Sequence, residues 1–320
     1  MKALVTGGAG FIGSQITEAL CRRGARVVVL DNLSLGSLQN LAWSRPADAL
    51  EFVQGDAGDA PLLRQILPGC DWVFHEAALP SVPLSVAEPV RSNAENLDAT
   101  VKLLVAARDA KVKRFVFASS SAIYGDNPVS PKREDLPPSP LSPYGLQKYT
   151  SETYASLFHQ LYGLPTVSLR YFNVFGPRQS FNSPYSGAIA RFCTAALAGQ
   201  PPTIFGDGLQ SRDFIYVANV VAANLLAAET PAQRVAGRFF NVAGGQSITL
   251  LDLVNELNRL TGRPLTPCFE PPRAGDVRAS QADISAFQAA TGYRVTVPWQ
   301  EGLKHTLEFY RQPQSSEVKP

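Results

Sequence analysis

Short apolar runs alternate with longer segments of helical periodicity through the first half of the chain. The runs predict buried strands, because nearly continuous apolar segments suit a parallel sheet covered on both faces. Strands that alternate with helices are typical of βαβ units, so the pattern predicts a doubly wound α/β fold. The expected strands are residues 3–6, 27–30, 51–53, 72–75, 115–118 and 166–171, and the expected helices are 11–23, 61–67, 90–110 and 143–162.

The pattern changes after Asn173, where Gly, Pro, Ser and Asn become frequent. Residues 176–187 and 199–208 predict loops, and residues 264–280 predict irregular structure. Short helices are expected at residues 188–198, 217–229 and 250–261. We therefore predict a nucleotide-binding domain over residues 1–173, a smaller loop-rich C-terminal substrate region mainly over 174–312, and a polar tail over 313–320. Some later segments are expected to return to the main sheet.

Composition excludes several classes of function. The chain of 320 residues has 29 Lys+Arg against 27 Asp+Glu, and this near balance argues against nucleic acid as a partner. The longest apolar runs fall far short of the roughly 20 residues that span a membrane. The four cysteines form no CxxC pair, so they predict small buried side chains rather than a metal or redox site. With no signal peptide at Met1, a cytoplasmic protein is expected.

A glycine turn follows the first expected strand and opens the first expected helix. Gly7, Gly10 and Gly13 have the spacing GxxGxxG, which lets the backbone turn tightly and approach a pyrophosphate at a helix N-terminus. Asp31 ends the second expected strand, where a carboxylate can accept hydrogen bonds from the adenosine ribose hydroxyls. A carboxylate there repels a ribose phosphate. The pattern therefore predicts a Rossmann-type site for NAD rather than NADP.

Two chemically useful side chains open the long expected helix. Tyr144 and Lys148 are four residues apart, so both lie on one helix face. An ammonium and a nicotinamide cation near a tyrosine favour its phenolate and lower its pKa. Residues 119–121 are three serines directly after the fifth expected strand, at the carboxyl edge where such sheets bind ligands. Their hydroxyls are therefore expected beside Tyr144.

Motifs of one known family stand in order along the chain. They are residues 7–13 (GGAGFIG), Asp31, residues 119–125 (SSSAIYG), Tyr144 with Lys148, and residues 170–173 (RYFN). In this order the sequence resembles the extended short-chain dehydrogenase/reductase family, and more narrowly the nucleotide-sugar 4-epimerases of the UDP-glucose and UDP-N-acetylglucosamine type. The match runs from Met1 to about residue 310.

The resemblance implies roles for individual residues. Tyr144 is the expected catalytic base and acid, Lys148 holds the cofactor ribose and lowers the tyrosine pKa, and Ser120 is the catalytic serine with Ser121 beside it. The implied cofactor contacts are Gly7, Gly10, Phe11, Ile12, Gly13, Asp31, Asn32, Asp56, Ala57, Ala77, Ala78, Leu79, Tyr144, Lys148 and Tyr171. The implied substrate contacts are Ser81, Ser120, Tyr144, Asn173, Ala188, Arg212, Arg273, Asp276 and Ser280.

The resemblance also implies which reaction follows. Family members oxidise the sugar at C4, and dehydratases or decarboxylases then use carboxylates just after the catalytic serine. This chain has Ser121 and Ala122 there, so it resembles the epimerases, which return hydride to the other face of a transient 4-keto sugar. By the same resemblance, Asn173, Arg212 and Arg273 hold the diphosphate and Asp276 contacts the uridine ribose.

Substrate width and alternatives complete the expectations. Ser280 stands where strict UDP-glucose/galactose epimerases carry a bulky tyrosine, so a 2-acetamido group is expected to fit. We therefore expect a 4-epimerase of plain and N-acetylated UDP-hexoses that works as a homodimer. A UDP-glucuronate 4-epimerase, or another enzyme that oxidises a sugar nucleotide at C4, is the alternative within the family. A non-catalytic NAD-binding regulator is the alternative of a different class.

Overall fold

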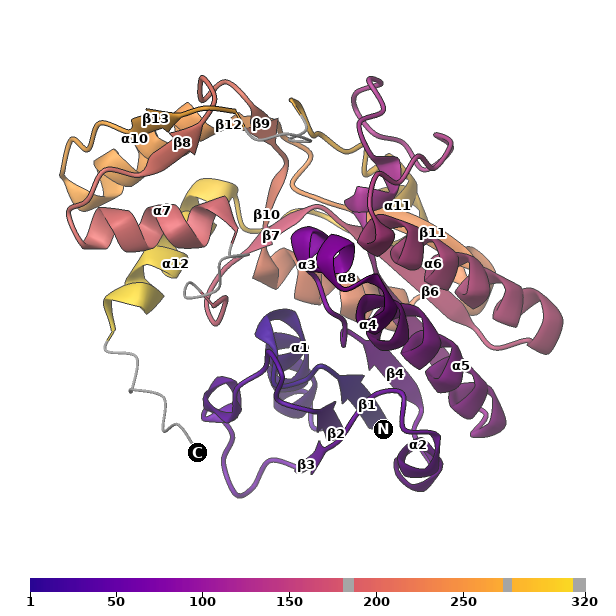
Figure 1. Cartoon of the computed structure of the whole chain (residues 1–320). Helices are drawn as coiled ribbons and strands as arrows, with labels where there is room; N and C mark the ends of the chain where they lie inside the picture. The colour runs from indigo at the N-terminus through magenta and orange to yellow at the C-terminus, as the bar shows by residue number, and fades with distance from the viewer. Residues whose placement is uncertain (181–186, 273–277, 313–320) are drawn as a thin grey trace.

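A seven-stranded sheet forms the centre of the computed structural model, which describes residues 1–180, 187–272 and 278–312. The strand order is β11-β6-β5-β4-β1-β2-β3, and every neighbouring pair is parallel (Figure 1). The strands are β1 (Lys2–Thr6), β2 (Arg26–Asp31), β3 (Leu50–Gln54), β4 (Trp72–His75), β5 (Arg114–Ser120), β6 (Thr166–Tyr171) and β11 (Arg238–Val242). The predicted doubly wound α/β fold is confirmed.

Helices cover both faces of this sheet, because successive strand residues point to opposite faces. Leu4 and Val5 of β1 show this, since they belong to separate buried clusters. One cluster joins the strands to α1 (Phe11–Arg22), α8 (Val217–Glu229) and α11 (Ser285–Thr291). The other joins them to α2 (Ala60–Ile66), α5 (Ala99–Asp109) and α6 (Pro143–Tyr162). The sheet therefore ends in a carboxyl edge that lies between two helical layers.

The helix expected over residues 90–110 is interrupted in the structure. It consists of α4 (Pro89–Asn93), a π-helical turn η2 (Ala94–Asp98) and α5. A further helix, α3 (Val82–Ala87), precedes it and was not predicted. The π turn directs Asn96 toward the end of β4, where its side chain accepts a hydrogen bond from the backbone N–H of Leu79 at 2.7 Å. Such single π turns are frequent at functional sites.

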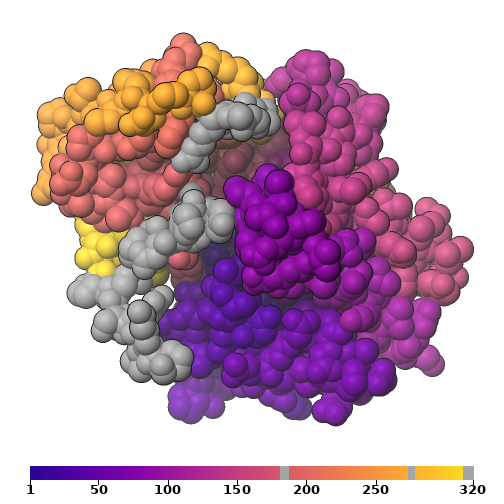
Figure 2. Space-filling view, in the orientation of Figure 1, coloured from indigo at the N-terminus to yellow at the C-terminus, as the bar shows by residue number. Residues whose placement is uncertain are grey.

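The later part of the chain builds a smaller unit with its own core. Its helices are α7 (Ala188–Leu197), α10 (Leu250–Thr261) and α12 (Trp299–Arg311), packed around a third buried cluster. Three two-stranded pairings accompany them: β7 (Asn173–Phe175) with β10 (Phe214–Tyr216), β8 (Thr203–Phe205) with β13 (Cys268–Glu270), and β9 (Ser211–Arg212) with β12 (Ile248–Thr249). In Figure 2 the orange elements of this unit face the indigo and purple N-terminal elements across a recess.

Two details of the sequence expectations were wrong. Residues 199–208 and 264–280 were expected as a loop and an irregular segment, but β8 and β13 pair in parallel there, too short to show a period. Cys268 lies on β13 and is exposed, whereas Cys21, Cys70 and Cys193 are buried as expected. As expected, a segment beyond residue 173 returns to the main sheet, because β11 pairs with β6 there. Among the described residues, no helix is both long and apolar enough to cross a membrane.

Candidate active site at the carboxyl edge of the sheet

The glycine turn between β1 and α1 leaves no room for side chains. Gly7 has φ +67°, and a Cβ there would lie 2.7 Å from the backbone nitrogen of Ala77. A Cβ on Gly13 would lie 2.2 Å from the carbonyl oxygen of Gly7. Gly10 is the N-cap of α1, and within this described segment no side chain caps the first turn, which Phe11 and Ile12 begin. The uncapped N–H groups and the close backbone therefore fit the pyrophosphate of NAD.

Asp31 holds this turn from the end of β2. Its carboxylate is buried and accepts hydrogen bonds from the backbone N–H groups of Ala9 at 3.0 Å and Leu33 at 2.8 Å. A carboxylate has about four acceptor positions, so both oxygens keep a lone pair for ribose hydroxyls. The expected adenosine contact is thus compatible with a second task, which is to fasten the glycine turn.

The remaining expected cofactor residues follow the ends of β2, β3 and β4. Asn32 donates to Asp56 at 3.4 Å, so these two side chains meet, and Ala57 packs nearby against the core. Leu79 is fixed by Asn96 of η2, whose amide also donates to the side chain of Gln147 on α6 at 2.8 Å. The sequence reasoning missed Asn96 and Gln147. The Asn96–Gln147 hydrogen bond thus ties the Ala77–Leu79 loop to the helix that carries Tyr144.

The three serines after β5 have different partners. Ser119 points into the core, where its hydroxyl donates to Glu152 at 2.7 Å. The Ser120 hydroxyl accepts from the backbone N–H of Ala122 at 3.1 Å, and it lies close enough to the Tyr144 phenol to lower the pKa of that phenol. Ser121 begins the short 3-10 helix η3 (Ser121–Tyr124). Ser120 is therefore the serine that the fold places beside Tyr144.

Tyr144 and Lys148 lie on the first turns of α6, as their spacing predicted. The Lys148 ammonium lies 5.9 Å from the Tyr144 ring centroid and donates to the Ala118 carbonyl at 2.7 Å. Burial lowers the pKa of Lys148 to about 8. Burial also raises the pKa of Tyr144, and only the Ser120 hydrogen bond opposes this rise. The lowered tyrosine pKa expected from the sequence is therefore not found in the protein alone.

A buried ion pair holds β6 and α6 together next to the three serines and Tyr144. Arg170 of β6 donates to Glu152 of α6 at 2.6 Å, with both side chains almost fully buried. Arg170 also donates to the Tyr124 hydroxyl at 2.8 Å, which donates to Asn241 of β11 at 2.7 Å. The sequence reasoning named the motif that contains Arg170 but missed its pairing with Glu152. The pair links the strand and helix that flank the serines.

Three expected substrate residues gather in the C-terminal unit. The backbone and side-chain N–H groups of Asn173 donate to the Asp213 carbonyl at 3.1 and 3.3 Å, next to Arg212. Ser280 donates its backbone N–H to the Ser211 carbonyl at 3.1 Å, on the other side of Arg212. Ser81 instead caps α3 by accepting from the backbone N–H of Leu84 at 3.1 Å, and Ala188 begins α7. Arg273 and Asp276 lie outside the described residues.

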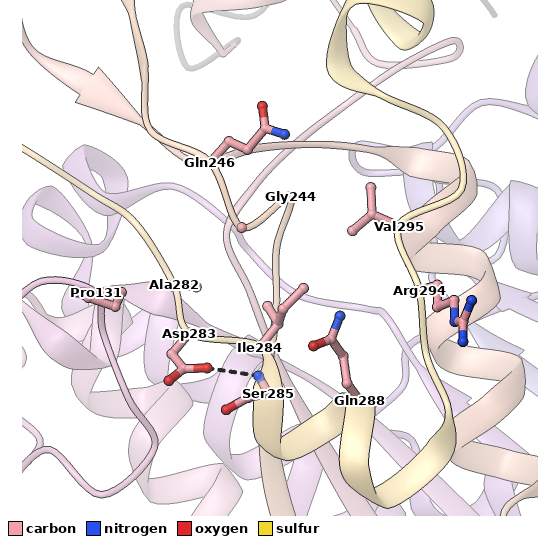
Figure 3. A pocket seen from close by; sticks show the side chains of 11 residues that line it. Pro131, Gly244, Gln246, Ala282, Asp283, Ile284, Ser285, Gln288, Arg294 and Val295 are labelled. Carbon is pink, nitrogen blue, oxygen red and sulfur yellow. Dashed lines mark hydrogen bonds between the residues drawn. The ribbon is translucent and has the colours of Figure 1, made fainter.

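Two pockets in the described part of the chain lie away from these residues. One, of about 530 Å³, is lined by Gly244, Asp283, Gln288 and neighbours; in Figure 3 Asp283 accepts from the backbone N–H of Ser285 at 2.8 Å. The other, of about 430 Å³, reaches the Glu152–Arg170 pair beside α6. Neither contains an expected cofactor or substrate residue, so the site is identified by its side-chain geometry.

Comparison with known proteins gives the family. The model of the NAD dependent epimerase/dehydratase family matches residues 3–243. A UDP-glucose 4-epimerase of Mycolicibacterium smegmatis is 39% identical over 315 residues, covering 97% of this chain and 99% of that protein. The extent of both matches, far beyond half of the chain, agrees with the order of motifs found in the sequence.

Solved structures with the same fold agree. A UDP-N-acetylglucosamine 4-epimerase from Methanobrevibacter ruminantium, in complex with UDP-N-acetylmuramic acid, is 42% identical with a TM-score of 0.91, covering 97% of this chain and 98% of that one. A UDP-glucuronic acid 4-epimerase from Bacillus cereus, in complex with UDP-glucuronic acid and NAD, is 33% identical with a TM-score of 0.86, covering 98% and 99%. The predicted NAD cofactor and isomerase class are confirmed. The chain belongs to the NAD dependent epimerase/dehydratase family, in which it is similar over nearly its whole length to UDP-sugar 4-epimerases.

Proposed function

We propose that the protein interconverts UDP-glucose with UDP-galactose, and UDP-N-acetylglucosamine with UDP-N-acetylgalactosamine, by epimerisation at C4. The observation that carries this proposal is the meeting of Tyr144, Lys148 and Ser120 at the carboxyl edge of the sheet, with Ala122 where a dehydratase needs a carboxylate. Tyrosine and serine suffice to move the proton of a sugar hydroxyl. Because Ser121 and Ala122 stand at the positions after the catalytic serine where family members that eliminate water or decarboxylate carry a carboxylate, reversal of the oxidation is the path that these residues favour.

The residues divide the work. When bound, NAD would supply the acceptor and donor for the hydride of the sugar C4. Tyr144 takes the proton of the 4-hydroxyl and gives it back, while Ser120 holds the same oxygen through its fixed hydroxyl. Lys148 lies 5.9 Å from the centre of the tyrosine ring and is the residue that would hold the cofactor ribose, and the positive nicotinamide ring of bound NAD would favour phenolate. The glycine turn would hold the pyrophosphate of the cofactor, and Asp31 would hold its adenosine ribose.

In this proposal, residues around β9 bind the diphosphate of the substrate. Asn173 and Arg212 are neighbours there, and a guanidinium can donate two parallel charge-assisted hydrogen bonds to a phosphate. Ser280 is attached to β9 by its backbone and contributes a short side chain. A 2-acetamido group therefore meets little steric resistance at this position. Arg273 and Asp276 complete the proposed set from outside the described residues.

Replacement of the catalytic phenol tests the mechanism. Tyr144→Phe removes only the hydroxyl, so we expect turnover to fall at least 100-fold while bound NAD remains. Turnover is measured with UDP-galactose, and NAD is quantified after denaturation. A regulator that merely binds NAD would show no turnover in the unaltered protein either, and persistence of turnover in Tyr144→Phe would contradict the assigned mechanism.

A product profile tests the substrate class. Incubating the protein with UDP-glucose, UDP-N-acetylglucosamine and UDP-glucuronate, without added NAD, is expected to give 4-epimers of the first two. Ser280→Tyr is expected to remove turnover of the acetamido sugar selectively, and Ser280→Ala to preserve both activities, because only the bulky ring fills the space. Turnover of UDP-glucuronate alone would favour the alternative reaction, and equal loss on both hexoses in Ser280→Tyr would contradict the assigned role of Ser280.

A further inference from the structure

Glu76 is an acidic residue in the proposed cofactor site that the mechanism above does not use. It follows the last residue of β4 and precedes Ala77, one of the expected cofactor contacts. Its backbone borders the glycine turn, because a Cβ on Gly7 would lie 3.0 Å from the Glu76 carbonyl carbon. Its charge also acts on Lys148. Glu76 therefore borders the glycine turn, and its charge acts on Lys148, the lysine expected to hold the nicotinamide ribose.

A directed chain of hydrogen bonds holds its carboxyl group. The Asn224 amide nitrogen on α8 donates to the Val220 carbonyl at 2.9 Å and to the Tyr171 hydroxyl oxygen at 2.7 Å. Because the carbonyl can only accept, it fixes which side-chain atom of Asn224 is the nitrogen. The Tyr171 proton is thereby directed to Glu76 Oε1 at 2.9 Å. The chain leaves Glu76 Oε1 as the acceptor at its end, and a hydrogen bond donated to a carboxyl group favours its ionised form.

The surroundings of Glu76 make its ionisation sensitive to nearby positive charges. Burial raises the pKa of Glu76 to about 7, while the hydrogen bond from Tyr171 and the charge of Lys148 oppose the rise. Its neighbour His75 is neutral, because burial lowers the pKa of that imidazole to about 3. Lys148 is the cation that acts on Glu76 from α6. An additional positive charge arriving beside Glu76 therefore favours ionisation.

We propose that Glu76 is a positioning residue whose carboxylate, held by Tyr171 and Asn224, lies beside the nicotinamide end of bound NAD and favours its oxidised form. This inference rests on the cofactor site assigned above. The oxidised nicotinamide ring carries a positive charge that is lost when the cofactor takes up two electrons and one proton. A carboxylate close to that ring therefore lowers the free energy of the oxidised state relative to the reduced state. Such a bias would favour the second half of each turnover, in which the transient 4-keto sugar takes the hydride back.

The test measures the redox balance of the bound cofactor in the holoenzyme. Redox mediators set the ambient potential, and the absorbance of reduced nicotinamide gives the ratio of reduced to oxidised NAD. Glu76→Gln keeps the shape and removes the charge, so we expect this ratio to rise at least tenfold at fixed potential, equivalent to about 30 mV for two electrons. Glu76→Asp keeps the charge and is expected to stay within about threefold of the unaltered protein.

A matched control exists in Glu134. It is also half-buried, burial raises its pKa, and it accepts from the backbone N–H of Asn241 at 2.8 Å, away from Lys148. Glu134→Gln is expected to leave the ratio unchanged. An equal ratio in Glu76→Gln and Glu134→Gln would overturn the role of Glu76. Bound NAD is counted first in the unaltered protein, because its absence there would contradict the cofactor site itself rather than the role of Glu76. Loss of NAD from Glu76→Gln but not from Glu76→Asp supports the same need for the charge.

Discussion

His75 and Glu76 are adjacent residues whose side chains lie on opposite faces of the sheet. The His75 ring bonds the hydroxyls of Thr6 at 2.7 Å and Thr100 of α5 at 2.9 Å. Glu76 faces α8 through Tyr171. Burial disfavours the charged form of both groups, so it lowers the pKa of His75 to about 3 and raises that of Glu76 to about 7. One strand end therefore carries two titrations of opposite effect on stability.

This opposition yields a pH prediction for Glu76→Gln in the protein freed of nucleotide. Between the ordinary Glu pKa of 4.5 and about 7, the unfolded chain has released this proton while the folded protein keeps it. As pH rises through that window, the titration of Glu76 therefore lowers the free energy of unfolding of the unaltered protein. The titration of His75 raises the free energy of unfolding over the same range, and it does so equally in both proteins. Across this window, the free energy of unfolding of Glu76→Gln should rise by about 2 kcal/mol relative to that of the unaltered protein. This figure is smaller than the full pKa shift implies, because the Glu76 side chain is only half-buried and solvent screens its charge.

Urea denaturation at the two ends of the window measures this difference. Parallel stability curves for the two proteins would show that Glu76 does not titrate between them. The comparison is made as a difference because other groups also contribute to the pH dependence of the whole protein.

At the scale of elements, the Arg170–Glu152 pair joins β6 to α6 beneath the serines. Removing one partner of a buried pair leaves the other charge without compensation, and this is more costly than the net value of the pair. Arg170→Met is therefore expected to lower the free energy of unfolding by about 3–5 kcal/mol. Arg133→Met breaks the solvent-exposed pair with Asp135 and should have no measurable effect on urea denaturation. Equal effects of the two substitutions would contradict the importance of the buried pair.

Elements with a clear period could be predicted from the sequence, and those set by tertiary contacts could not. The apolar runs of β1, β2, β4, β5 and β6 are mostly buried on both faces of the sheet, so they are visible in the sequence. β3 is an edge strand whose residues are only partly buried, and its apolar run is correspondingly shorter. β8 and β13 have three residues each and form only because they pair with one another. The π turn η2 leaves the apolar spacing of the helical segment unchanged, so the sequence does not reveal it. What marks the turn in the structure is a contact outside the helix, the hydrogen bond between Asn96 and Leu79.

The same distinction applies to the site. The glycine turn and the Tyr144–Lys148 pair are local patterns, so their spacing in the sequence already carries their geometry. The hydrogen bond between Tyr171 and Glu76 joins β6 to the end of β4, and β5 lies between these strands in the sheet. Such a contact follows from strand order and from which face each residue takes. The spacing of residues along the sequence does not reveal a contact between two strands that are not neighbours in the sheet.

At the scale of the molecule, α6 carries an apolar stripe on its outer face. Leu146, Tyr154, Leu157 and Leu161 are exposed, and their spacing places them along one side of the helix. In Figure 1, α3 and α4 lie beside α6, and Val90 of α4 adds an exposed side chain. An apolar stripe of this length is typical of a surface that another protein covers. We propose that a second copy of the chain covers it, which is the homodimer expected from the sequence.

Leu157→Glu tests this homodimer, because it places a charge in the middle of the stripe. We expect the unaltered protein to sediment as a dimer and Leu157→Glu as a monomer. Leu209→Glu changes an exposed leucine in the loop before β9, and its oligomeric state should remain that of the unaltered protein. A monomeric unaltered protein, or identical behaviour of the two variants, would contradict the assignment of this face.

The position of β11 has a consequence for synthesis of the chain. β6 is complete at Tyr171, but the strand that covers its outer edge ends only at Val242. During translation, the N–H and C=O groups along that edge stay unpaired while the intervening residues emerge from the ribosome. Open edges of this kind pair readily with other chains. The nascent protein is therefore prone to aggregate during the period between synthesis of Tyr171 and synthesis of Val242. Chaperones that bind extended apolar segments would act on it during this period.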